Sequence, residues 1–294
     1  MQIMIIVGGP ASNGLDEGLA KLTGARHFKV EHKIFPDGES YIRIPENVRG
    51  DDVVVVQSTY YPQDKHLIEL LLIVETVNDL QANSVTAVVP YLAYARQDRR
   101  FREGEALSVK TILRALSNAG ADTLIVVEPH HMDALSYFEG EVRVADPMPE
   151  IAKLFKGEND LFVLAPDKGA YNRAQRLATE LGAEFDYIEK SRNRISGEIS
   201  LVSGPSKDLS GKKVVLVDDI ASTGGTLAQA AKVAYERGAK EVVAVVIHGV
   251  FATDDAFEKL RSAGIKRVIT TNTIPPKFQG LEVVDVSASI QRKL

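Results

Sequence analysis

The sequence predicts an α/β protein with two tandem domains, each built on a mainly parallel, doubly wound sheet. Three observations carry this prediction. Runs rich in Val and Ile alternate along the chain with segments of helical spacing. Most of these runs lack polar alternation, as expected of parallel strands that are buried on both faces. The length of 294 residues also exceeds that of one typical domain.

The expected elements follow one another almost without interruption. Apolar runs predict eight strands, in residues 3–9, 51–59, 85–93, 123–131, 161–169, 212–220, 241–249 and 266–272. Helical spacing predicts helices in residues 66–80, 109–120, 171–182 and 257–264, and in a segment beginning near Leu227. Several of the helices end in a glycine, the usual C-terminal signal. Each strand–helix–strand unit favours a parallel pair of strands.

A short internal similarity supports two copies of one domain. Residues 118–131 and 236–249 both run from a helix end through Gly-Ala to a Val-rich strand and a histidine. One constant offset aligns Gly120 with Gly238 and His130 with His248. We therefore expect an N-terminal domain in residues 1–142 and a C-terminal domain in residues 143–294.

Composition excludes several classes of protein. The formal net charge of −5 argues against a general nucleic-acid binder. The absence of cysteine excludes a disulfide framework, thiolate metal sites and cysteine nucleophiles. The first residues lack the basic region of a signal peptide, and no apolar run reaches the length of a membrane span. We expect a soluble, cytoplasmic protein with no nucleic-acid or membrane partner.

The stretch VVLVDDIASTGGTLAQA (residues 214–230) joins a buried strand to a helix through a loop of small residues. Such a loop lies at the carboxyl end of a strand, where open α/β sheets bind ligands. Small side chains let backbone N–H groups and the helix amino terminus approach a phosphate. No lysine follows the glycines, so this is not a nucleotide P-loop. Asp218 and Asp219 suit sugar hydroxyls or the coordination shell of magnesium (Mg²⁺). The alternative is an ordinary turn with a capping threonine.

The segment KIFPDGESYIRI contains good turn chemistry in Pro-Asp-Gly and predicts a hairpin. A functional interpretation is that Phe35 stacks on a base while Asp37 and Glu39 accept hydrogen bonds from it. A second polar segment follows the strand at residues 85–93 and carries Arg96 and Gln97, with further arginines at 99, 100 and 102. Guanidinium groups suit polyphosphates, and a glutamine can read a purine edge, although clustered arginines usually form a solvated face.

Two more stretches carry candidate chemistry. His130 and Asp167 each follow an apolar strand and could hold a divalent cation, although packing is the commoner role of one histidine. The small residues of PDKGA before the helix at Tyr171 offer a second anion site. Lys190 and Arg192 lie in a polar segment that we expect to be a loop. Their cations either are solvated or close over transferring phosphates.

Taken together, these motifs resemble the ribose-phosphate diphosphokinases. VDDIASTGGT resembles a phosphoribosyl-binding motif that phosphoribosyltransferases share. The combination of FPDGE, YARQDR, the strand-end His130 and the K-x-R triplet, in family order over nearly the whole chain, is specific. The resemblance implies two phosphoribosyltransferase-like domains. It also implies transfer of diphosphate from ATP to the C1 hydroxyl of ribose 5-phosphate, leaving AMP.

The resemblance assigns roles to individual positions. It implies contacts to ATP for Phe35, Asp37, Gly38, Glu39, Arg96 and Gln97. It implies contacts to ribose 5-phosphate for Arg192, Asp218, Asp219, Ser222, Thr223, Gly224, Gly225 and Thr226. The diphosphate loop would be Asp167, Lys168, Gly169 and Ala170. Mg²⁺ would be held by His130 and Asp167, and the transition state would be stabilised by Lys190 and Arg192. A homo-oligomer, at least a dimer, is implied because Phe35 would reach a neighbouring active site.

Two positions depart from the common family pattern. Ser222 stands where many members carry a third acid, and Glu128-Pro129 replaces Asp-Leu before the histidine. Both resemble variants of a shorter archaeal-type branch. A phosphoribosyltransferase is the alternative function, but it leaves FPDGE, YARQDR and K-x-R unexplained. A catalytically silent regulator ranks last, since the cations and the histidine are present.

Overall fold

The computed structural model describes residues 3–192 and 199–294 and divides the chain into two compact units. Unit 1 comprises the residues up to Asp146 together with Asn272–Ile274 and Asp285–Leu294, and unit 2 comprises Pro147–Thr271 and Pro275–Val284. A boundary after residue 142 would fall inside strand β8 (Glu141–Ala145), which belongs to the sheet of unit 1. The C-terminal residues that the sequence analysis placed in the second half return to unit 1.

Unit 1 is built on a six-stranded sheet in which every neighbouring pair of strands is parallel. The order across the sheet is β2 (Arg26–Lys29), β1 (Met4–Gly8), β5 (Asp52–Val56), β6 (Ser84–Val89), β7 (Thr123–Val127) and β8. The central strands are buried because helices cover both faces. The predicted parallel α/β architecture is therefore confirmed for this unit.

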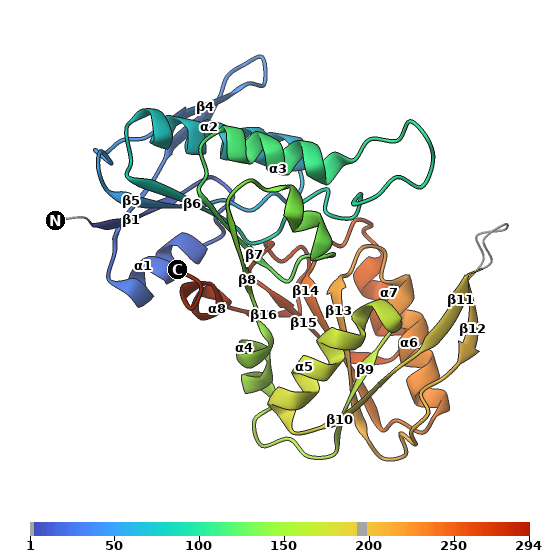
Figure 1. The fold of residues 1–294 in the computed structure, drawn as a ribbon. Helices are drawn as coiled ribbons and strands as arrows, with labels where there is room; N and C mark the ends of the chain where they lie inside the picture. Colours follow the sequence, from blue (N-terminus) through green and yellow to red (C-terminus); the bar gives the residue numbers. More distant parts are fainter. Residues whose placement is uncertain (1–2, 193–198) are drawn as a thin grey trace. The chain divides into compact units, whose positions relative to one another are not determined.

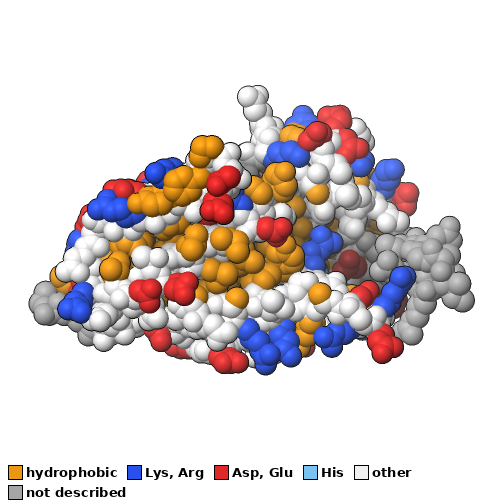
Figure 2. Space-filling view, turned by 90° about the horizontal axis from the view of Figure 1, so that it is seen from above, with side chains coloured by type: hydrophobic (Ala, Val, Ile, Leu, Met, Phe, Trp, Pro, Cys, Tyr) orange, Lys and Arg blue, Asp and Glu red, His pale blue; other side chains and the backbone are white. Residues whose placement is uncertain are grey.

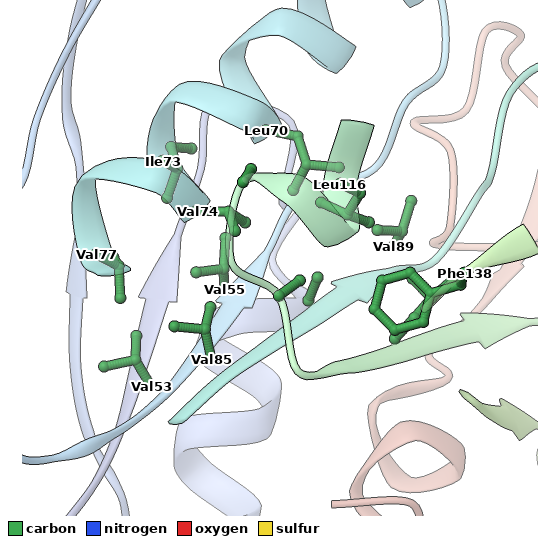
Figure 3. Packing of buried hydrophobic residues seen from close by; sticks show 14 of the residues in the cluster. Val53, Val55, Leu70, Ile73, Val74, Val77, Val85, Val89, Leu116 and Phe138 are labelled. Atoms are coloured by element: carbon green, nitrogen blue, oxygen red, sulfur yellow. The ribbon is translucent and has the colours of Figure 1, made fainter. Parts of the chain in front are cut away.

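Helices α2 (Gln63–Asp79) and α3 (Ser108–Asn118) cover one face of this sheet, and α1 (Leu15–Thr23) and α8 (Ser287–Gln291) cover the other (Figure 1). Figure 3 shows side chains of α2 and α3 meeting alternate residues of β5 and β6 in the core. Leu70, Ile73 and Val74 of α2 are fully or almost fully buried there. This packing fixes the position of α2 on the sheet.

Unit 2 repeats the plan of unit 1. Its parallel sheet has the order β10 (Glu184–Tyr187), β9 (Leu161–Ala165), β13 (Lys213–Ile220), β14 (Glu241–His248), β15 (Ile265–Thr271) and β16 (Leu281–Val284). Helices α6 (Gly225–Glu236) and α7 (Ala256–Ser262) pack on one face. On the other face α4 (Met148–Ala152) packs on α5 (Tyr171–Leu181), which contacts β9.

Each unit also carries a two-stranded antiparallel hairpin at the same point of its topology. In unit 1, β3 (Glu31–Ile34) and β4 (Ser40–Arg43) lie between β2 and β5 along the chain. In unit 2, β11 (Glu189–Arg192) and β12 (Ile199–Ser203) lie between β10 and β13. The predicted hairpin around FPDGE is confirmed. The expectation of a loop at Lys190 and Arg192 is wrong, because both residues belong to strand β11.

The duplication is confirmed, but the alignment that suggested it is wrong. The strand before His130 is β7, the fifth in the order of its sheet, whereas the strand that leads to His248 is β14, the fourth. The matching strand order of the two sheets pairs β6 with β14 and β7 with β15. The similarity around Gly120 and Gly238 is thus a general feature of helix-to-strand junctions, where a glycine with positive φ ends the helix.

Charged side chains of both signs are interspersed with apolar ones on the face shown in Figure 2. The exposed apolar side chains of the protein include Tyr61 and Ile68, which are 79% and 53% exposed. No helix within the described part of the chain is both long and apolar enough to cross a membrane.

Candidate active site

Two acids occupy the carboxyl end of β13, at the centre of the sheet of unit 2. Asp219 is buried and Asp218 is partly buried. An oxygen of Asp218 accepts the backbone N–H of Asp219 at 2.9 Å, which fixes the first carboxylate. The flanking strands β9 and β14 hold β13 on both sides, so these carboxylates sit on a rigid element.

The electrostatics of this acid pair are unfavourable in the free protein. Burial raises the pKa of Asp218 well above its usual range, and the nearby carboxylates of Asp219 and Asp167 raise it further. The guanidinium of Arg173 acts in the opposite direction. Three acids gathered at one point are typical of a site that awaits a cation or hydrogen-bond donors.

Arg173 belongs to the candidate site and was missed by the sequence analysis. Its side chain, buried on α5, places Nη2 3.5 Å from Oδ2 of Asp219. Nη1 donates to the carbonyl of Gly169 at 3.4 Å, so one guanidinium contacts both the acid pair and the loop after β9. A signal was present, because Arg173 shares the apolar face of its helix with Ala174 and Leu177.

The loop after the acids leads directly into the amino terminus of α6. Gly224 is the N-cap, with φ of 76°, and no side chain caps the helix.

 A Cβ at Gly224 would lie 2.8 Å from the carbonyl oxygen of Ala256, so only glycine fits. The first N–H groups of α6 have no carbonyl ahead of them within the helix. Thr223 and Thr226 are exposed beside them and Ser222 is partly buried, which leaves a cradle suited to a phosphate.

The loop after β9 is closed on itself in this structure. Asp167 is the N-cap of the short helix η3 (Lys168–Ala170), and its Oδ1 accepts the N–H of Gly169 at 2.9 Å. The N–H of Ala170 donates to the carbonyl of Asp167 at 3.2 Å. An anion that used these two N–H groups would therefore have to replace Asp167 as their partner. Lys168 and Gly169 are exposed, so the loop is accessible.

In unit 1 the FPDGE segment forms the turn of the β3–β4 hairpin. The N–H of Phe35 donates to the carbonyl of Glu39 at 2.8 Å, and Gly38 has φ of 96°. Phe35 is 38% exposed and meets the ring of Tyr41 edge-on, with the Nζ of Lys33 4.9 Å from its centroid. Asp37 and Glu39 are exposed as well. The turn thus presents one aromatic ring and two carboxylates to solvent.

The segments after β6 and β7 meet at the same edge of the unit 1 sheet. Arg96 is exposed and has no ion-pair partner among the described residues, while the side chain of Gln97 donates to the carbonyl of Arg99 at 3.2 Å. His130 packs edge-on against His131, whose Nε2 lies 3.9 Å from Oδ2 of Asp98. The structure therefore brings the YARQDR segment next to the histidine pair.

The remaining candidates are defined only by the backbone. Lys190 and Arg192 pair with Leu201 and Ile199 across the β11–β12 hairpin. Their side chains, and the neighbouring Arg194, lie outside the described part of the structure. Within that part, no group of three or more His, Asp or Glu side chains is arranged to hold a metal ion.

Comparison with known proteins gives matches over nearly the whole chain. A family model described as the N-terminal domain of ribose phosphate pyrophosphokinase matches residues 4–120, and one for the phosphoribosyl transferase domain matches residues 143–284. Ribose-phosphate pyrophosphokinases of Sulfolobus acidocaldarius and Sulfurisphaera tokodaii are 56% and 58% identical over 99% of this chain and 100% of theirs. The crystal structure of phosphoribosylpyrophosphate synthetase from Mycobacterium smegmatis superposes with a TM-score of 0.87 at 30% identity, covering 99% of this chain and 97% of that one.

Proposed function

We propose a division of roles among the residues described above from one premise: this chain belongs to the ribose-phosphate pyrophosphokinase family. The enzyme transfers the diphosphate of ATP to the C1 hydroxyl of ribose 5-phosphate. The C1 oxygen forms a bond to the β-phosphorus of ATP, and the bond from that phosphorus to the oxygen bridging the α-phosphorus breaks. AMP leaves, and the hydroxyl proton passes to solvent. The alternative of a phosphoribosyltransferase is not favoured, because the matches to pyrophosphokinases extend over both units.

The observation that carries the proposal is the acid pair at the end of β13 beside an uncapped helix. The amino terminus of α6, from Ser222 to Thr226, binds the 5-phosphate. Asp218 and Asp219 accept hydrogen bonds from the ribose hydroxyls, which stabilises the carboxylates against the burial and the repulsion that raise the pKa of Asp218. Binding therefore places the sugar on two carboxylates that a rigid strand holds in position.

Diphosphate transfer depends on alignment and charge neutralisation rather than on covalent chemistry by the protein. We propose that Lys190 and Arg192 stabilise the negative charge that develops on the transferring diphosphate and on the departing AMP. Arg192 also contacts ribose 5-phosphate in this proposal. The loop from Asp167 to Ala170 takes the diphosphate once its N–H groups exchange Asp167 for a phosphate oxygen. Among the described residues, none stands out as a general base for the C1 hydroxyl.

We assign the ATP side to unit 1. Phe35 stacks on adenine, and Asp37 and Glu39, flanking Gly38, accept hydrogen bonds from its amino group. The exposed guanidinium of Arg96 pairs with the phosphates and Gln97 contacts the nucleotide. We further propose a homo-oligomer, at least a dimer, in which this hairpin serves a neighbouring copy, and a cytoplasmic location, where ATP is plentiful.

We propose that Mg²⁺ serves as the cofactor. The donor set fits a hard cation, since Asp167 belongs to a cluster of carboxylates whose repulsion a divalent charge would relieve. No metal-holding group of three occurs among the described residues, so substrate phosphates would supply the remaining oxygen ligands. When bound, the ion would neutralise phosphate charge. His130 would contribute an imidazole nitrogen on the ATP side.

The test is release of AMP from ATP, measured with and without ribose 5-phosphate. We expect AMP to appear only when both substrates and Mg²⁺ are present, together with one equivalent of the diphosphorylated sugar. A control reaction supplies that sugar diphosphate and a purine base in place of the two substrates. Turnover in the control and none with ATP would identify a phosphoribosyltransferase and overturn the proposal.

A further inference from the structure

Glu69 is a fully buried acid on α2 that the mechanism above does not use. Its Oε1 lies 2.8 Å from Nε2 of His32 on β3 and accepts the hydroxyl of Ser40 on β4 at 2.9 Å. One oxygen of one side chain thus joins both strands of the hairpin to the helix beneath them.

The other oxygen of Glu69 is fixed from the opposite side. Nε2 of Gln57 donates to Oε2 at 3.4 Å, and Oε1 of Gln57 accepts the backbone N–H of Ala11 at 2.8 Å. Lys65, one turn earlier on α2, places Nζ 3.7 Å from Oε1. The carboxylate is therefore held in one orientation by groups that belong to the core of unit 1.

The hairpin has little other support near its turn. Its two strands form a sheet of their own, separate from the six-stranded sheet. A hollow of about 510 Å³ lies between turn residues 38–40 and the helix residues Asp64, Lys65, Ile68 and Leu72. Ile42, the cross-strand partner of His32, packs against the core. The bonds of His32 and Ser40 to Glu69 thus tie both strands of the hairpin to α2, and Ser40 does so next to the turn that carries Phe35 and Glu39.

We propose that Glu69 is a positioning residue for recognition of the base of the nucleotide donor. This inference rests on the proposed role of the β3–β4 hairpin in binding adenine. Asp37 and Glu39 can accept hydrogen bonds from the amino group of adenine but not from the carbonyl that guanine carries at the same place. Such discrimination requires acceptors held in fixed positions. Loosening the hairpin should therefore weaken ATP binding and reduce the preference for ATP over GTP.

The experiment compares Glu69→Gln and Ser40→Ala with Ser40→Thr, which keeps the hydroxyl. Glu75→Gln, at an exposed position on the same helix, is the matched control. We expect KM for ATP to rise about tenfold in Glu69→Gln and about threefold in Ser40→Ala, as for lost hydrogen bonds. The ratio of kcat/KM for ATP to that for GTP should fall in both. KM for ribose 5-phosphate and kcat should stay within about twofold, and Ser40→Thr and Glu75→Gln should resemble the parent.

A purely structural role predicts a different pattern. If Glu69→Gln and Ser40→Ala lower the melting temperature but leave KM for ATP and the ATP-to-GTP ratio unchanged, the proposal is wrong. An equal rise of KM for ATP and for ribose 5-phosphate would also overturn the proposal. Should Glu69→Gln fail to fold, Ser40→Ala and Ser40→Thr decide alone. Phe35→Ala tests the adenine site separately from the role of Glu69. If KM for ATP rises in Phe35→Ala but not in the Glu69 and Ser40 variants, only the role of Glu69 is refuted. If KM for ATP rises in none of these variants, the adenine site itself is refuted.

Discussion

Replacing Arg173 by methionine should destabilise the free protein in a way that depends on pH. Arg173 is buried and is the cation that faces Asp219 and lowers the pKa of Asp218. Methionine keeps most of the length and apolar volume of the side chain but removes its charge. The variant therefore leaves three carboxylates together without their compensating guanidinium.

The size of the effect follows from the geometry. At 3.5 Å between Nη2 and Oδ2, two unit charges attract by about 5 kcal/mol when the effective dielectric constant is about 20. Removing one partner of a buried ion pair typically costs about 3–5 kcal/mol, because the other charge stays buried. For a unit of this size, each kcal/mol lowers Tm by about 2–4 °C. We expect Tm to fall by about 10 °C at neutral pH.

The sign of the pH dependence follows from the raised pKa of Asp218. The native state binds more protons than the unfolded state between the ordinary pKa of an aspartate, about 3.9, and the raised value. Stability from this group is therefore lost as pH rises through that window. Without Arg173 the pKa rises further and the loss becomes larger. The difference between variant and parent should be smallest below about pH 4 and largest near neutrality.

Thermal melting of both proteins from about pH 4 to pH 8 measures this difference. Lys232→Met, which removes an exposed cation from α6, is the control for loss of a positive charge and should change Tm by less than about 2 °C. A Tm difference for Arg173→Met that is the same at every pH would show that packing, not charge, is lost. No difference at neutral pH would refute the electrostatic reasoning altogether.

Three further outcomes are expected. Lys190→Ala and Arg192→Ala should lower kcat by about 10²–10³ and leave ATP affinity and Tm nearly unchanged, as measured by turnover, nucleotide titration and thermal melting. Turnover within a few-fold of the parent would show that both residues are surface charges without a catalytic role. Asp218→Asn should raise Tm of the free enzyme, because it removes the carboxylate whose pKa burial and its neighbours raise, and should weaken use of ribose 5-phosphate; a lowered Tm would contradict this. His130→Ala should raise the Mg²⁺ concentration needed for half-maximal activity, and an unchanged requirement would return His130 to a packing role.

The regular elements could be predicted where burial dictates the residue pattern. All eight apolar runs contain strands, because a strand covered on both faces needs apolar side chains throughout. The edge strands β2, β8, β10 and β16 are absent from these eight runs, since each includes polar residues that are at least partly exposed. The strand at Lys190 was also missed, because backbone pairing in a hairpin requires no apolar pattern in the sequence.

The candidate site was predictable in its loops and not in its buried supports. Asp218, Asp219 and the glycines could be identified because two acids and a loop of small residues follow one apolar strand and precede a helix. Arg173 and Glu69 lie within ordinary amphipathic helices, each on the buried face. A charge on an apolar stripe is the signal that could have found them, but their partners come from segments far apart in sequence.

The two copies of the fold use the same topological position in opposite ways. At the carboxyl end of the third strand in sheet order, unit 1 carries Gln57 and unit 2 carries Asp218 and Asp219. The amide of Gln57 is satisfied internally, by the N–H of Ala11, the carbonyl of His66 and the carboxylate of Glu69. Asp218 instead has its pKa raised by burial and by neighbouring acids, an arrangement that costs stability until a ligand compensates for it. The internal pairing in unit 1 supports a hairpin that presents recognition groups, whereas the neighbouring carboxylates in unit 2 mark the place where we propose that the substrate binds.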